Sequence, residues 1–250
     1  FSYSCNNTIK ENIITNNEEG IYLFYSYRDN IKDNKITGNL YGLLIEGAMG
    51  AYINRNEVTN NTDIGIGLWE CYGAAYGAPL VLKNNRLINN GFNMDVEPAW
   101  SPWEYFHDID DSNTVNGKPI YYWVNEHNKQ VPANAGYVAL INCTRITVWN
   151  LNLTNNGQGV LCALTADSTV TNVKASNNCW SGISLDFFSQ GNFISHNIIT
   201  HAYYGILLSY GSNDNKINGN TVTRGDCGIF LASSGNEVTD NTILDNRWGT

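Results

Sequence analysis

A repeat of about 23 residues runs through the 250-residue chain and constrains its fold more than any other feature. The repeating unit is N-x-[IV]-x-x-N-x-x-G-[IV]-x-L, in which an Asn precedes a Gly by eight residues. The unit occurs, sometimes in shortened form, at Asn12–Leu23, Asn34–Ile45, Asn197–Leu208, Asn220–Leu231 and Asn241–Thr250. A fixed period of this length is typical of solenoids, in which each repeat forms one turn of a continuous stack.

The Gly of this unit defines a column of equivalent positions, which we call the glycine column. We expect it at Gly20, Gly42, Gly65, Asn93, Gly136, Gly159, Gly182, Gly205, Gly228 and Gly249. Two spacings of 28 and 43 residues, against 21 to 23 elsewhere, indicate insertions on either side of Asn93. We expect Asn93 to replace a glycine because Asn tolerates left-handed backbone better than most residues.

Apolar residues occupy the first and third positions after each Gly, as in Ile21 with Leu23 and Ile206 with Leu208. This alternation predicts a short strand with one side facing a core. Further short alternating runs upstream give three strands per repeat, which describes one coil of a parallel β-helix. The fold class is therefore all-β: a single-stranded parallel β-helix of about ten coils, forming one domain over 1–250. An aromatic-rich loop insertion is expected over 97–135.

Asparagine supplies 39 of the 250 residues. Stacked coils place equivalent turn residues about 4.8 Å apart, a spacing at which side-chain amides can bond along the stack. Asn also caps turns and adopts left-handed backbone. We therefore interpret most asparagines as structural.

Composition excludes several functions. The net charge is −9 and the chain has no basic cluster, so a nucleic-acid partner is not expected. No apolar stretch reaches 18 residues, so no membrane span is expected. The six cysteines, four histidines and two methionines show no metal-ligand spacing, so we predict free thiols, no metal and no cofactor.

The coil motif resembles that of NosD-type β-helix proteins, also described as the carbohydrate-binding and sugar-hydrolase repeat. The segments DDSNTVNGKPIYY (Asp110–Tyr122) and NLNLTNNGQGV (Asn150–Val160) are similar to an insertion found in archaeal surface β-helix proteins, those of methanogens especially. The resemblance covers nearly the whole chain. It implies a right-handed coil, which the crossover rule for parallel strands also favours, and a secreted or cell-surface location.

The 97–135 insertion holds the residues that we consider for carbohydrate binding: Trp100, Trp103, Tyr105, Asp108, Asp110, Asp111 and Trp123. Aromatic rings with nearby carboxylates can stack on sugars, and outward strand positions at Tyr22, Phe24 and Trp69 are also aromatic. Alternatively, the insertion folds back and buries its rings, or it forms a protein interface. The three aspartates could instead hold Ca²⁺.

No catalytic residues are assigned. Pectin-degrading β-helix enzymes combine NTD, DD, GHG and RIK motifs, whereas this chain has only NTD at Asn61–Asp63 and no GHG. The Asp108–Asp111 cluster is the best pair of carboxylates for hydrolysis, which needs two aimed at one bond.

The two ends of the chain fit the same repeat. If the last residues of one copy are followed by the first residues of another, the distance from Gly249 to Asn12 equals that from Gly228 to Asn241, so the second copy completes the last coil of the first. This match predicts head-to-tail stacking of subunits into an open filament, or else a segment cut from a longer β-helix. The expected contact residues are Phe1, Tyr3, Ile9, Ile229, Phe230, Leu231, Trp248 and Thr250.

The sequence thus favours a structural protein, secreted or displayed at the cell surface, that self-associates into a fibre, sheath or surface layer. The alternative is a carbohydrate-binding or polysaccharide-processing β-helix, with a polysaccharide or glycan as partner. Sequons at Asn6, Asn60, Asn142 and Asn152 could carry glycans in an exported chain.

Overall fold

The computed structural model describes residues 3–73, 77–97 and 100–250. The chain divides into two compact units, 1–120 and 121–250, which are described separately here. Regular structure in the described residues consists of β-strands and one 3-10 helix, η2 (Pro102–Tyr105). The all-β prediction is confirmed, and none of the described residues belong to a helix long and apolar enough to cross a membrane.

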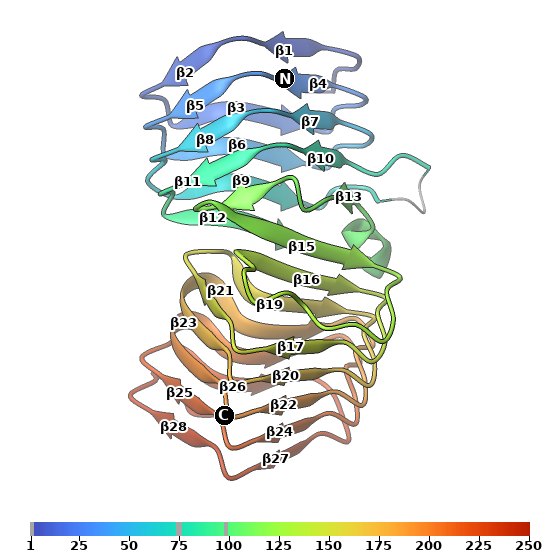
Figure 1. The fold of residues 1–250 in the computed structure, drawn as a ribbon, viewed down its shortest axis with the longest axis vertical. Helices are drawn as coiled ribbons and strands as arrows, with labels where there is room; N and C mark the ends of the chain where they lie inside the picture. Colours follow the sequence, from blue (N-terminus) through green and yellow to red (C-terminus); the bar gives the residue numbers. More distant parts are fainter. Residues whose placement is uncertain (1–2, 74–76, 98–99) are drawn as a thin grey trace. The chain divides into compact units, whose positions relative to one another are not determined.

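Three sheets build the first unit, and each of its first four coils gives one strand to every sheet (Figure 1). The first sheet contains β3 (Glu19–Phe24), β6 (Tyr41–Glu46), β9 (Ile64–Trp69) and β12 (Phe92–Glu97). The second contains β1 (Thr8–Lys10), β4 (Asn30–Lys32), β7 (Tyr52–Asn54), β10 (Val81–Lys83) and β13 (Asp108–Ile109). The third contains β2 (Ile13–Thr15), β5 (Lys35–Thr37), β8 (Glu57–Thr59), β11 (Arg86–Ile88) and β14 (Thr114–Val115). β15 (Lys118–Val124) follows and pairs antiparallel with β14.

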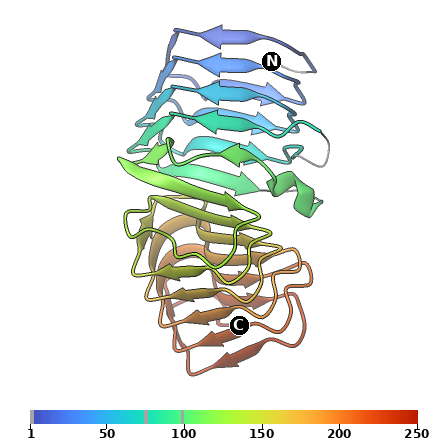
Figure 2. The same cartoon turned by 45° about the vertical axis from the view of Figure 1, so that its right-hand side comes forward.

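The second unit repeats this plan, with its own coils stacked one after another (Figure 2). One row of strands is β16 (Tyr137–Ile141), β19 (Gln158–Ala163), β21 (Lys174–Asp186), β23 (Ile198–Leu208) and β26 (Cys227–Leu231). A second row is β17 (Thr147–Trp149), β20 (Thr169–Thr171), β22 (Phe193–Ser195), β24 (Lys216–Asn218) and β27 (Glu237–Thr239). β18 (Asn152–Thr154), β25 (Thr221–Thr223) and β28 (Thr242–Leu244) complete the third row, joined by the first halves of the long strands β21 and β23.

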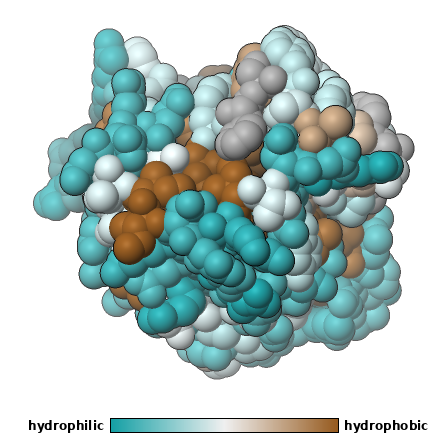
Figure 3. Space-filling model, turned by 90° about the horizontal axis from the view of Figure 1, so that it is seen from above, coloured by the Kyte–Doolittle hydropathy of each residue, from teal (hydrophilic) through white to brown (hydrophobic). Residues whose placement is uncertain are grey.

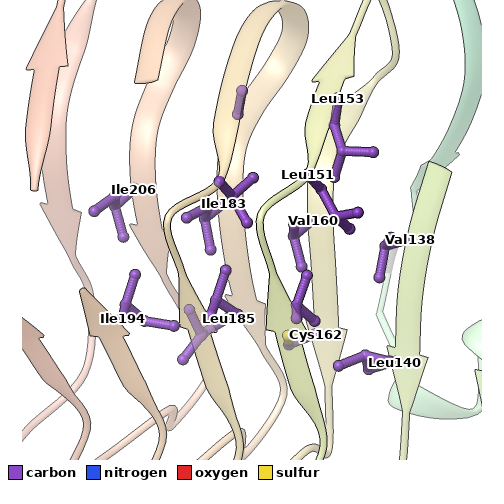
Figure 4. Close-up of a cluster of buried hydrophobic side chains, with 14 of the residues drawn as sticks. Val138, Leu140, Leu151, Leu153, Val160, Cys162, Ile183, Leu185, Ile194 and Ile206 are labelled. Carbon is purple, nitrogen blue, oxygen red and sulfur yellow. The ribbon is translucent and has the colours of Figure 1, made fainter. Parts of the chain in front are cut away.

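Pairing between coils is parallel and in register, so that equivalent apolar residues stack inward. In the first unit Ile21, Leu43 and Ile66 occupy equivalent positions in successive coils, and all three are buried. In the second unit the inward side chains form one continuous apolar cluster (Figure 4). The predicted parallel solenoid of about ten coils is therefore what the chain forms.

Asparagines bond along the stack as predicted. One ladder of the first unit consists of Asn12, Asn34, Asn56, Asn85 and Asn113. Each donates its backbone N–H and its side-chain amide to the Oδ1 atom of the next, at 2.9–3.1 Å. The second unit has the same arrangement at Asn197, Asn220 and Asn241.

The glycine column has a different cause from the one expected. Its members do not have left-handed backbone, and neither does Asn93, which does lie level with Gly65 as predicted. Instead a Cβ at Gly42 would lie 2.6 Å from the carbonyl oxygen of Gly65 in the next coil and 2.7 Å from a methyl group of Val58. Positions such as Gly42 are glycine because the adjacent coil approaches too closely there for a side chain.

One member of the predicted column is wrong by one residue. Val138 pairs with Val160 and Leu140 with Cys162, so Tyr137 rather than Gly136 lies level with Gly159. Register is fixed by which side chains point inward, and a one-residue slip would expose the apolar set. The Tyr137 hydroxyl donates to Gln158 Oε1 at 3.0 Å within the buried interior.

The predicted insertion at 97–135 is only partly a loop. β13 pairs with β10 and β14 with β11, so both short strands extend the sheets of the first unit. The irregular part is the segment around η2. There a Cβ on Gly73 would strike the carbonyl oxygen of Trp103, which shows that η2 packs directly on the backbone that follows β9.

Candidate functional site

The outer face of the β3–β6–β9–β12 sheet carries two columns of side chains opposite to the inward apolar set. The register gives one column as Tyr22, Leu44, Gly67 and Asp95. The other is Phe24, Glu46, Trp69 and Glu97. We call this surface, together with Tyr25 and Glu70 at the adjoining turn, the acidic aromatic face. In the second of these columns rings and carboxylates alternate from strand to strand.

Aromatic rings gather at the β3 end of this face. Tyr22 and Phe24 have ring centroids 5.7 Å apart, and Phe24 meets Tyr25 edge-on at 4.7 Å. Tyr3 stacks on Tyr25 at 5.7 Å and is 73% exposed. The Tyr25 ring lies over Gly47, where a Cβ would come within 2.6 Å of it. The rings therefore form a half-buried, mutually supported surface.

Hydrogen bonds from ring donors fix two carboxylates of the face. The Tyr22 hydroxyl donates to Glu46 Oε2 at 2.5 Å, and Trp69 Nε1 donates to Asp95 Oδ2 at 2.9 Å. Burial, followed by the bond to Glu46, raises the pKa of Tyr22 above its usual value, so this hydroxyl keeps its proton. Asp95 is only 2% exposed. Ring and carboxylate are thereby held in fixed relative orientations.

The loop residues predicted to bind carbohydrate separate into exposed and buried groups. Trp100 is 87% exposed and Trp103 is also exposed, with its ring 5.3 Å from that of Phe106. Tyr105 is only 1% exposed, so its ring does not face solvent. Packing of η2 on Gly73 places Trp103 beside the segment that leaves β9, at the border of the acidic aromatic face.

The predicted aspartates lie on a different sheet. Asp108 belongs to β13, and Lys83 Nζ lies 3.3 Å from Asp108 Oδ2 and 3.8 Å from Asp110 Oδ2. Asp110 Oδ1 also accepts a hydrogen bond from the backbone N–H of Ser112, while Asp111 is exposed. A cation between them makes Asp108 and Asp110 an ion-paired surface group rather than two carboxylates aimed at a substrate.

Comparison with known protein families shows to which of them the chain belongs. The profile described as "Periplasmic copper-binding protein (NosD)" matches residues 1–120 and 107–250. The chain belongs to the NosD family. A comparison of this NosD-family chain with curated proteins finds no match.

Several solved structures are similar to this NosD-family chain at low sequence identity. The A-module of mannuronan C-5 epimerase AlgE4 of Azotobacter vinelandii is 16% identical, with a TM-score of 0.40, and the match covers 98% of this chain and 55% of that one. The AlgE6 A-module of the same organism is also 16% identical, with a TM-score of 0.36, and the match covers 91% of this chain and 59% of that one. An alginate lyase from Paenibacillus sp. str. FPU-7 is 14% identical, with a TM-score of 0.35, and the match covers 95% of this chain and 78% of that one. The chain thus spans little more than half the length of the two epimerase modules.

The remaining predicted residues of this NosD-family chain lie in several places. Trp123 is half-buried in β15, with its ring 6.0 Å from that of Tyr121 and Lys129 Nζ 5.7 Å from its centroid. Phe230, Leu231, Trp248 and Thr250 are exposed on the last coils, and Ile9 is half-buried in β1. Ile229 is buried in the core, so it is not a surface residue. Phe1 lies outside the described residues, and the sequon asparagines are all exposed.

The second unit of the NosD-family chain presents its own aromatic cluster. Trp180 stacks on Tyr203 at 5.6 Å, and Tyr204 lies 5.1 Å from Phe230. Sequence reasoning identified the outward aromatic residues Tyr22, Phe24, Trp69 and Phe230, but it missed two carboxylates of the face, Glu46 and Asp95. The signal that could have found them is their position two or four residues after the glycine column, the same offsets that Tyr22 and Phe24 occupy.

Proposed function

We propose that the acidic aromatic face binds a polysaccharide chain. The observation that carries the proposal is the alternation of rings and oriented carboxylates across β3, β6, β9 and β12. Ring faces pack against the C–H surfaces of sugars, and carboxylates accept hydrogen bonds from hydroxyl groups. Strands about 4.8 Å apart would present these groups in succession to a ligand that runs along the coils.

Binding, rather than cleavage, is the activity that this geometry supports. Glycoside hydrolysis needs two carboxylates placed on one bond, one of them free to give a proton. Glu46 already accepts a hydrogen bond from Tyr22, which suits it to a recognition role, and the buried Asp95 accepts one from Trp69 and so orients that ring.

Affinity electrophoresis in gels that contain soluble polysaccharides, followed by calorimetry with oligosaccharides, tests this function. We expect Trp69→Ala and Phe24→Ala each to weaken binding at least about tenfold, the loss that follows from more than about 1.4 kcal/mol at a central aromatic contact. Tyr52→Ala is the matched control, because Tyr52 is an exposed ring on β7 in a different sheet. Equal affinities for all three variants and the unmutated protein would overturn the proposal.

Head-to-tail stacking is the second candidate function, and one feature favours it. The face of the first unit seen from above has apolar side chains in its centre and hydrophilic ones around them (Figure 3). In both units each ladder asparagine donates to the asparagine of the following coil. A further coil would therefore meet matching donors and acceptors, whether it came from the same polypeptide or from another copy. Light scattering across a concentration series, with electron microscopy, tests stacking. Monodisperse particles at every concentration would rule it out.

We further infer that the chain acts outside the cytoplasm, at the cell surface or beyond, where polysaccharides occur. The NosD family description includes a periplasmic location, and the exposed sequons are compatible with export. Protease accessibility on intact cells tests the location.

The copper in the family description does not fit the residues present. No group of three His, Cys, Asp or Glu side chains gathers anywhere in the described residues. Burial raises the pKa of Cys71 to about 12 and also raises that of Cys162, which opposes the thiolate form that binds copper. We therefore assign no copper role to this chain.

A further inference from the structure

We propose that the glycan bound by the acidic aromatic face is cationic, an oligomer of an amino sugar with free amines. This inference rests on the proposed function and adds the charge class of the ligand. It follows from how charge is distributed among the three sheets of the first unit.

Positive charge is missing from the strands that form the face. β3, β6, β9 and β12 contain no Lys or Arg, but they contain Glu19, Glu46, Asp95 and Glu97. Asp63 and Glu70 flank β9 at its two ends. A ligand lying across the outer face of these strands would meet the carboxylates of Glu46 on β6 and Glu97 on β12, and no side-chain cation on any of the four strands.

Basic residues of residues 1–120 lie elsewhere on the coils. The sheet of β1, β4 and β10 carries Lys10, Lys32 and Lys83. The sheet of β5 and β11 carries Lys35 and Arg86. The other basic residues are Lys118 on β15 and, in turns, Arg28 and Arg55. Several already have acidic partners: Arg55 with Asp33, Lys83 with Asp108 and Arg86 with Glu57. The strands of the two sheets that flank the face carry more basic than acidic residues, whereas the strands of the face carry acidic residues alone.

Charge complementarity therefore selects the ligand. A polyuronate would bring its carboxylates against those of Glu46 and Glu97, which are both half-exposed, and like charges at close range are repelled most strongly where water is partly excluded. An ammonium group is attracted by the same carboxylates and by the faces of the adjacent rings. Trp69, which bonds to Asp95 and lies in the column of Glu46, offers both at one place.

The test uses three oligosaccharides of equal length at a pH at which the amine is protonated. One is a glucosamine oligomer, the second is its N-acetylated and hence neutral counterpart, and the third is an oligouronate. Calorimetry with the full chain should give an affinity for the glucosamine oligomer at least tenfold above that for the other two. This preference should decrease as salt is raised, because exposed charges are screened.

Two variants with the same change in net charge test the location. Glu46→Gln should weaken binding of the glucosamine oligomer several-fold and reduce its dependence on salt. Glu57→Gln, on β8 of another sheet, should leave both unchanged. Circular dichroism establishes that both variants fold.

The outcomes separate the two proposals. Equal or tighter binding of the neutral oligomer or the oligouronate, lost in Trp69→Ala, would overturn the cationic ligand and leave glycan binding standing. Loss of binding in Glu57→Gln equal to that in Glu46→Gln would also overturn it, since net charge alone would then explain the preference. Binding of none of the three, nor of any polysaccharide in the gels, would overturn the proposed function itself.

Discussion

At the residue scale, the buried asparagines decide whether the coils can stack. Asn56 accepts hydrogen bonds from the N–H and side-chain amide of Asn34 and donates to the Ile31 carbonyl and to Asn85 Oδ1. A side chain that satisfies four groups in a buried turn has no apolar substitute. The same four-way bonding explains why so polar a residue type dominates the interior turns.

Asn56→Ala should lower the free energy of unfolding by about 2–4 kcal/mol, because buried polar groups left without partners cost about 1–3 kcal/mol each. Urea unfolding followed by circular dichroism measures the loss. Lys35→Ala, at an exposed position of β5, serves as the control and should change stability by less than about 0.5 kcal/mol. Similar losses in the two variants would contradict a structural role for the ladder.

His107 gives the fold a dependence on pH. Burial lowers the pKa of His107 to about 3, and its Nδ1 accepts the Leu80 N–H at 3.4 Å, so the folded chain holds it neutral. In the unfolded chain its pKa is about 6.5. Between these two values the unfolded state binds a proton that the folded state does not, so stability falls as pH falls through that window.

We expect acidification from pH 7 to pH 4 to remove about 3 kcal/mol through His107, from about 1.4 kcal/mol per pH unit below 6.5. Unfolding free energies measured across this range, compared between the unmutated protein and His107→Leu, isolate the contribution. The variant should show a shallower decline. Parallel curves for the two proteins would show that His107 does not titrate in this way.

At the scale of elements, the distance between adjacent strands depends on the glycine column. In the second unit a Cβ at Gly182 would lie 2.7 Å from the Gly205 carbonyl oxygen and would overlap a methyl group of Ile199. Both neighbours belong to β23, the strand that pairs with β21. Neither can move without displacing the coil to which it belongs.

Gly182→Ala should therefore destabilise the protein by about 1–3 kcal/mol or more, the usual cost of overpacking. Gly249→Ala is a matched control, since the same column position there has nothing within 4 Å of the added Cβ. Thermal unfolding compares them. A melting temperature for Gly182→Ala equal to that of the control would show that the coils can separate at low cost.

At the scale of the whole molecule, stability should be local. Each of the units 1–120 and 121–250 has its own buried core and its own ladders. In solenoids each repeat contacts mainly its neighbours, so opening of one region need not open another.

Hydrogen exchange of Gly182→Ala tests this expectation. Amides of β19, β21 and β23 should exchange faster than in the unmutated protein, while those of β4, β7 and β10 should change little. An equal loss of protection throughout both units would show that the chain unfolds as a single cooperative body.

The sequence by itself determined the solenoid, because repeats of about 23 residues with inward apolar pairs bury a core only when they stack on their neighbours. It also determined the ladders, since identical turn residues must stack. That the coils form one domain and turn in the right-handed sense stays a prediction from the sequence and its resemblance.

Only the tertiary structure decided the rest. The register of Tyr137 depended on where the chain re-enters the stack after the insertion, which local pattern does not encode. The hydrogen bonds of Glu46 with Tyr22 and of Asp95 with Trp69 join residues that are 24 and 26 positions apart in the sequence. The segment that contains the buried Tyr105 packs on Gly73, about 30 residues earlier in the chain. Such contacts arise from stacking in space, so a linear sequence can show their residues but not their meeting.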